Sequence, residues 1–267
     1  MRAFADREPP IHVTEWMDAG AVADPPAVLV HGTLSWGTLT FERQRTLALR
    51  RRLLVPDRRG FGASPDLHGS RYTSDHDVDA RDVIALLSGG GHLVGHSYGA
   101  VVAMLAAAAR PDLVRSLALI EPPAHMVAID DPVVAAAVTR ARAFMALARR
   151  ESAEDYLRIV FDDNDVPRPA PPDRLLRAAA TALHERPCWL ADVPVAPLAS
   201  AAYPRLVLVG ARDARAAGFD PVLPLVARTV ADRIGADLVT VAGAGHDVQR
   251  DRPGETNRLL ERLWSAG

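Results

Sequence analysis

The amino-acid sequence predicts an α/β fold, in which a mainly parallel, doubly wound sheet is interrupted by a helical insertion. Three observations predict this class. Short apolar runs of strand length alternate with longer helical patterns over most of the 267 residues. Several of these runs end in turns that carry glycine and polar side chains. Between residues 122 and 202 the strand pattern stops and only helical patterns remain.

Seven segments have the pattern of a strand. Residues 11–16 alternate polar and apolar side chains, which is typical of an edge or antiparallel strand. The other segments are apolar runs of the kind that parallel sheets bury on both faces. They begin at residues 27, 52, 92, 114, 204 and 237. The helical patterns between them, over 36–49, 75–87, 100–109 and 221–234, predict helices on both faces of the sheet.

The segment 122–202 is expected to form a helical cap over one edge of the sheet. Helical patterns cover 131–150, 152–161 and 173–185, and proline-rich breaks separate or end them. Ser152 and Asp155 have the spacing of a capping box. We therefore expect a single domain over residues 1–267, with the cap inserted before its last two strands.

Composition excludes several classes of function. The formal net charge is -2 and the arginines are scattered, so no basic face for nucleic acid is expected. The chain has no lysine, which excludes lysine Schiff bases and the P-loop type of nucleotide site. The first 16 residues lack the apolar core of a signal peptide, and the apolar run 100–109 is too short to span a bilayer. We expect a cytoplasmic protein without membrane or nucleic-acid partners.

The most informative motif is Gly95-x-Ser97-x-Gly99, between an apolar strand and an apolar helix. This is the pattern of a nucleophile elbow, a strained turn that raises a serine hydroxyl above the end of a sheet. The residues beside the serine must be small because the helix passes close to the strand. Gly95, Gly99 and Ala100 meet that requirement.

Two more polar residues follow predicted parallel strands at the same end, and they complete a set for acyl transfer. The chain order is Ser97, Asp213, His246, the order that a nucleophile elbow requires. Serine needs an imidazole to take its proton, and the imidazole needs a carboxylate on its other nitrogen. The developing oxyanion needs two N–H donors, for which Tyr98 and Thr33 are the candidates.

These motifs make the sequence resemble the α/β-hydrolase fold superfamily, in particular its small, cap-bearing, esterase-like members. The resemblance implies a sheet of the α/β-hydrolase type, with Ser97 as nucleophile, His246 as base and Asp213 as acid. It also implies an oxyanion hole without metal or cofactor. Some members carry the acid after the strand that precedes the cap, and Glu121 occupies that position here. The matching segments are 31–33, 57–64, 95–99, 210–213 and 245–246.

We predict a serine hydrolase that cleaves a small or medium carboxylic ester or lactone. Related dehalogenases and epoxide hydrolases use an aspartate at the elbow, so the resemblance argues against both. An acyltransferase, lyase or cyclase of secondary metabolism is the alternative, and a non-catalytic ligand-binding protein is a third possibility. The substrate is expected to lie in an apolar pocket under the cap, for which the candidates are Trp36, Met126, Phe144, Tyr156 and Trp189.

Overall fold

The computed structural model describes residues 9–160, 170–211 and 222–267. Within these ranges the strands form one sheet in the order β1-β3-β2-β4-β5-β6-β7. β1 pairs with β3 in the antiparallel sense, and every other neighbouring pair is parallel. The strands are β1 (Val13–Trp16), β2 (Val22–Val30), β3 (Arg51–Pro56), β4 (Gly91–His96), β5 (Val114–Ile120), β6 (Arg205–Ala211) and β7 (Asp237–Ala242).

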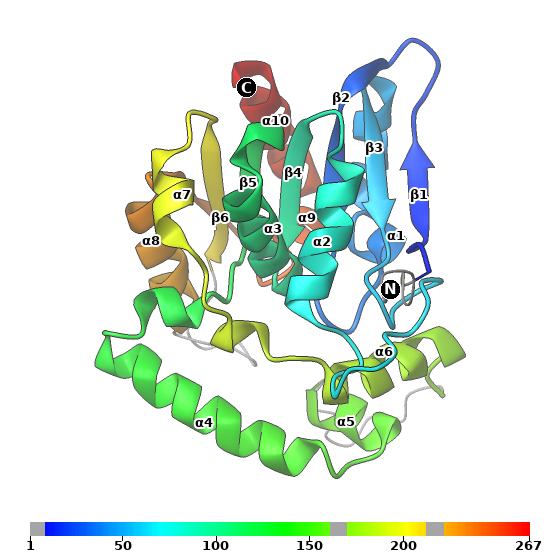
Figure 1. Cartoon of the computed structure of the whole chain (residues 1–267), viewed down its shortest axis with the longest axis vertical. Coiled ribbons are helices and arrows are strands. Elements are labelled where there is room, and N and C mark those ends of the chain that lie inside the picture. Colours follow the sequence, from blue (N-terminus) through cyan, green and yellow to red (C-terminus); the bar gives the residue numbers. More distant parts are fainter. Residues whose placement is uncertain (1–8, 161–169, 212–221) are drawn as a thin grey trace, which may run out of the picture.

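Helices cover both faces of the sheet, as the alternation predicted (Figure 1). Successive side chains of a strand point to opposite faces, so β5 contributes Leu117 and Leu119 to one apolar cluster and Ala118 and Ile120 to the other. The first face carries α2 (His76–Leu86), α3 (Tyr98–Ala109), α7 (Val195–Ser200) and α8 (Val222–Ile234). The second carries α1 (Gly37–Thr40), the 3-10 helix η1 (Glu42–Leu49), α9 (Val248–Asp251) and α10 (Pro253–Ala266).

The segment between β5 and β6, here called the cap segment, is helical in its described parts. Its long helices lie beyond the carboxyl ends of the parallel strands (Figure 1). They are α4 (Pro132–Ala148), α5 (Ala153–Val160) and α6 (Asp173–His184), and η3 (His125–Ala128) and η4 (Cys188–Leu190) are short 3-10 turns. The helices of the described chain include none that is both long enough and apolar enough to cross a membrane.

One local prediction is confirmed with a difference in detail, and one helix was missed. The segment 36–49 is helical as expected, but as the short α-helix α1 followed by the 3-10 helix η1. The Gly37 N–H donates to the Asp57 carboxylate at 2.8 Å, and the Gln44 amide donates to the main chain of Gln249 at 2.9 Å. Helix α7 was missed because its prolines indicate a break. Pro194 precedes the helix and Pro197 lies in its first turn, where no hydrogen-bonded N–H is required.

Candidate active site

The elbow between β4 and α3 holds Ser97 in a strained conformation. Ser97 has φ 53° and ψ -123°, and α3 begins at the next residue. A Cβ atom on Gly95 would overlap the main chain of Gly99, and one on Gly99 would overlap the carbonyl oxygen of Val30. Glycine is therefore required at both positions, and the close packing of strand against helix leaves Ser97 at the end of the sheet.

His246 meets Ser97 across the carboxyl edge of the sheet. It lies in the loop between β7 and α9, and its Nε2 is 3.0 Å from the Ser97 Oγ. The His96 ring lies 5.0 Å from the His246 ring, centre to centre, and the His96 Nε2–H donates to the His246 carbonyl oxygen at 3.0 Å. Serine and imidazole are thus within the distance needed for transfer of the hydroxyl proton.

Glu121 provides the carboxylate that the described residues place against His246. It follows β5 directly, and its side chain is fully buried. One carboxylate oxygen accepts the Gly210 N–H at 2.7 Å, and the other lies 3.4 Å from the His246 Nδ1. Glu121 therefore lies on the imidazole nitrogen opposite the one that contacts Ser97. Asp213, the acid that the sequence favoured, lies outside the described residues.

Of the two expected oxyanion donors, Tyr98 follows Ser97 directly and Thr33 follows Gly32, which packs against Ser97. Gly32 packs so closely on the elbow that an added Cβ would lie 2.9 Å from the Ser97 Cβ, which brings the following residue, Thr33, to the nucleophile. Within the described part of the chain, the Thr33 N–H donates no hydrogen bond. Tyr98 opens α3, where an N–H has no partner inside the helix. Both amides are thus available to an oxyanion.

Backbone strain is concentrated at this edge. Leu34, Ser97 and Glu121 are the described residues other than glycine that have a positive φ, with values of 56°, 53° and 53°. They follow β2, β4 and β5, three strands that are neighbours in the sheet. Such conformations cost about 1–3 kcal/mol each and are retained where the surrounding structure enforces them, most often at functional sites.

His31 fixes the turn that carries Thr33. Its Nδ1–H donates to the Gly32 carbonyl oxygen at 2.7 Å, and its Nε2 accepts the Arg58 N–H at 2.8 Å. Burial, and then the positive charge of Arg58, hold the pKa of His31 well below its usual range. The imidazole is therefore neutral, which its role as donor on one side and acceptor on the other requires.

The predicted pocket residues are dispersed over the cap segment and the core. Trp36 is half-buried, with the Arg174 guanidinium 4.4 Å from its ring centre. Tyr156 is buried among side chains of α5 and α6, whereas Phe144 on α4 is 44% exposed. Met126 and Trp189 are half-buried in the short turns η3 and η4. That these five side chains line one pocket stays a prediction.

One group of side chains has the composition of a metal site. The possible ligand atoms of Asp75, His76 and Asp77 lie within 4.8 Å of one another. The guanidinium of Arg186 already occupies this group, at 3.2 Å from the Asp75 carboxylate and 2.6 Å from that of Asp77. The cluster is therefore an ion-pair network on α2 and not a set of open ligands.

The sequence did not identify Arg58 and Glu185 as site residues, but the structure places both beside the Thr33 turn. The Arg58 guanidinium donates to the Gly32 carbonyl oxygen at 3.3 Å, and the Thr33 hydroxyl donates to the Glu185 carboxylate. Arg58 lies in the segment 57–64, which carries part of the family resemblance, so its sequence position weakly indicated a role near the site. Glu185 follows a cap helix, and no local pattern connects it to the turn.

The chain is similar to a known protein family along most of its length and to two curated proteins over part of it. The family model described as "Alpha/beta hydrolase family" matches residues 27–259. Lipase LipV of Mycobacterium tuberculosis is 36% identical over 117 residues, which are 42% of this chain and 41% of LipV. Probable lysophospholipase BODYGUARD 3 of Arabidopsis thaliana is 28% identical over 130 residues, 46% of this chain and 26% of that protein. The matches thus span less than half of either curated relative.

Among solved structures, NosK from Streptomyces actuosus is similar over nearly the whole chain. The TM-score is 0.60 with 28% sequence identity, and the superposition covers 91% of this chain and 98% of NosK. The similarity therefore extends over nearly the full length of both chains.

Proposed function

Because the chain belongs to the alpha/beta hydrolase family, we propose that it is a serine hydrolase that cleaves a small or medium carboxylic ester or lactone. The observation that carries the proposal is the 3.0 Å contact between the His246 Nε2 and the Ser97 Oγ at a strained elbow. The names of the two curated relatives, a lipase and a probable lysophospholipase, support ester chemistry.

In the proposed reaction, the Ser97 Oγ attacks the ester carbonyl carbon while the His246 Nε2 takes the hydroxyl proton. The tetrahedral oxyanion receives the N–H groups of Thr33 and Tyr98. Its collapse breaks the bond to the alkoxy oxygen, which leaves with the proton from His246. Water then attacks the acyl-enzyme, again with His246 as base, and releases the carboxylic acid and free Ser97. In a lactone, the leaving oxygen stays joined to the acyl group through the carbon chain of the former ring, so this last step releases a single hydroxy acid.

We assign the role of orienting His246 to Glu121. The assignment is supported by its carboxylate, which lies 3.4 Å from the Nδ1 and is held from behind by the Gly210 N–H. A contact of this length is expected to shorten when substrate binds and the imidazole gains charge. Asp213 is the alternative acid, since it follows β6, the strand next to β5 in the sheet.

The nucleophile is tested with a fluorophosphonate probe and a series of p-nitrophenyl esters of increasing acyl length. We expect the probe to label the wild type and Ser200→Ala, an exposed control, but not Ser97→Ala. Ser97→Ala should lower ester turnover by roughly 10³–10⁴-fold or more. Equal labelling of all three proteins would exclude Ser97 as the nucleophile. Probe labelling without hydrolysis of any ester would instead favour the acyltransferase, lyase or cyclase alternative.

The acid is tested by comparing Glu121→Gln with Asp213→Asn. If Glu121 orients His246, its amide variant should lower kcat by about 10³-fold or more, because an amide cannot stabilise the imidazolium. Asp213→Asn should then have a much smaller effect. The opposite order would assign the acid to Asp213, with Glu121 as a structural neighbour.

A further inference from the structure

Both residues of the proposed oxyanion hole are tied by their side chains to the point where the cap segment leaves α6. The Thr33 hydroxyl donates to the Glu185 carboxylate, and the Tyr98 hydroxyl donates to the Arg186 carbonyl oxygen at 3.0 Å. Residues 185 and 186 are consecutive, and they are 152 and 88 positions from their partners. The end of the cap segment thus reaches both oxyanion donors at once.

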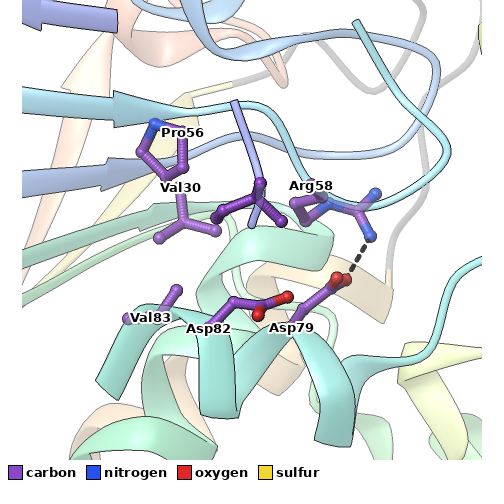
Figure 2. Close-up of a pocket in the computed structure, with 7 residues that line it drawn as sticks. Val30, Pro56, Arg58, Asp79, Asp82 and Val83 are labelled. Atoms are coloured by element: carbon purple, nitrogen blue, oxygen red, sulfur yellow. Dashed lines mark hydrogen bonds and ion pairs between the residues drawn. The ribbon is translucent and has the colours of Figure 1, made fainter. Parts of the chain in front are cut away.

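Arg58 joins this contact to the core of the protein. Its guanidinium bonds to the Asp79 carboxylate at 3.0 Å and to the Glu185 carboxylate at 3.2 Å. Figure 2 shows the first of these bonds, between the loop after β3 and helix α2. The face of the guanidinium lies 3.8 Å from the centre of the Tyr98 ring. Arg58 is 2% exposed and Glu185 is 7% exposed, so water competes little for these bonds.

The Glu185 carboxylate uses both of its oxygens. One accepts the Thr33 hydroxyl and the other accepts the Arg58 guanidinium, the pattern of an ionised acid. The Asp79 carboxylate, the Cys188 thiol and the hydroxyls of Tyr98 and Tyr156 are other titratable groups around it. Burial raises the pKa of Glu185 to about 7, and the charge of Arg58 opposes that shift.

The Thr33 turn is restrained on one side by His31 and Arg58, which bond to the Gly32 carbonyl oxygen, and on the other side by Glu185. Within the described chain, the hydroxyl of Thr33 has Glu185 as its partner, and its N–H donates to no group. The next residue, Leu34, is held at φ 56°. A turn in a strained conformation relaxes when its side-chain contact is removed. The direction of the Thr33 N–H therefore depends on the bonds to the Gly32 carbonyl oxygen and on Glu185, which bonds both to the Thr33 hydroxyl and to Arg58.

We propose that Glu185 is a positioning residue, which directs the Thr33 amide toward the oxyanion by holding the Thr33 side chain from the end of the cap segment. The oxyanion hole is then complete only when residues 185–186 are docked on the core, and the cap segment contributes to the rate of reaction as well as to substrate binding. The expected effect on the rate rests on the proposed function, whereas the contacts of Glu185 and Arg186 do not.

The first test compares variants at the two ends of the contact. Thr33→Val keeps the amide and the branched shape but removes the hydroxyl, and Thr33→Ser keeps the hydroxyl. Glu185→Leu removes both acceptors, and Glu185→Gln keeps one. Glu151→Gln on the exposed surface of the cap segment is the control. Since Glu185→Leu leaves the Arg58–Asp79 pair in place, we expect it to fold, and thermal unfolding checks this.

We expect Thr33→Val and Glu185→Leu to lower kcat by about 10- to 100-fold with KM changed less than about threefold, because a displaced oxyanion donor acts on the transition state. Thr33→Ser, Glu185→Gln and Glu151→Gln should retain most of kcat. The double variant Thr33→Val/Glu185→Leu should be no worse than either single variant, since both remove the same contact. Full kcat in Thr33→Val, or multiplied losses in the double variant, would overturn the proposal.

A second measurement is independent of the reaction. In two-dimensional NMR, the amide resonance of Thr33 should move in Glu185→Leu and stay in place in Glu151→Gln. An unmoved resonance in Glu185→Leu would refute the positioning role even if esters are hydrolysed. A moved resonance in a protein that does not hydrolyse any ester would support the contact while rejecting the proposed function.

Discussion

Helices α6 and α4 belong to the same cap segment but are attached to the protein in different ways. Three polar side chains of α6, Arg174, Arg177 and Thr181, bond to the loop 57–66 that follows β3. The Thr181 hydroxyl, for example, donates to the Gly60 carbonyl oxygen at 2.7 Å. Helix α4 instead exposes large apolar side chains, namely Val133, Phe144 and Leu147.

This difference suggests separate roles for the two sides of the cap segment, one in the proposed reaction and one in substrate preference. The α6 side is hydrogen-bonded to the core and continues into residues 185–186, which contact the proposed oxyanion hole. Under the proposed mechanism, the α6 side has to keep one position for the reaction to proceed. Helix α4 buries Val134 and Val138, but its exposed apolar side chains have no partner in the described structure, so its outer face is free to vary in sequence. We expect differences in substrate preference to arise on the α4 side.

The largest effect is expected at the buried ion pairs under the α6 side. Arg58→Leu leaves the Asp79 and Glu185 carboxylates buried without their cation. The free energy of unfolding should fall by about 3–5 kcal/mol, measured by chemical denaturation. Arg43→Leu, which breaks an exposed pair with Glu42, should cost less than about 1 kcal/mol. Similar losses of unfolding free energy in both variants would show that the buried ion pairs of Arg58 stabilise the protein no more than an exposed ion pair does.

The second effect is a pH dependence of the free energy of unfolding, which Glu185 introduces. Its pKa is raised from 4.5 to about 7, so the folded protein binds a proton more tightly than the unfolded chain does. This contribution to stability is fully present below pH 4.5 and is lost as pH rises through 7. Between these values, the wild type should lose about 2–3 kcal/mol of unfolding free energy relative to Glu185→Gln. Denaturation of both proteins across this pH range measures it, and parallel curves would contradict it.

A smaller effect is expected at the hydrogen bonds of α6. The Arg177 guanidinium donates to the Gly62 carbonyl oxygen at 2.6 Å and to the Ser64 carbonyl oxygen at 2.8 Å. Arg177→Ala should lower the free energy of unfolding by about 1–2 kcal/mol. The matched control is Arg140→Ala on α4, which lies on an exposed position and should change stability by less than about 0.5 kcal/mol. Equal costs on the two helices would show that they are attached alike.

The smallest effect is expected on the exposed face of α4. Leu147 is 64% exposed, so Leu147→Ala removes little buried apolar surface. The free energy of unfolding of this variant, measured by thermal unfolding, should differ from that of the wild type by less than about 0.5 kcal/mol. A loss above about 1.5 kcal/mol would mean that this side chain is covered in solution, and the contrast between α4 and α6 would then be weaker than we infer.

Much of the fold could be predicted because its signals are local. Six of the seven strands are short apolar runs, and these six lie in parallel ladders, in which the edge strand β7 is largely exposed and the inner strands are buried. The elbow could be predicted because Gly95 and Gly99 must be small for α3 to pass close to β4 and to the end of β2. Helix α7 could not, because the prolines that its first turn tolerates indicate a break.

The sequence by itself determined the class of fold, the family resemblance, and the residues that meet at the elbow. Each depends on a pattern of neighbouring residues, or on the rule that parallel strands place their carboxyl ends at one edge. Only the tertiary structure placed Glu121 against His246, because Glu121 and Asp213 both follow strands that are adjacent at that edge. Only the tertiary structure joined Glu185 to Thr33, because a polar contact across 152 residues leaves no periodic trace in either segment.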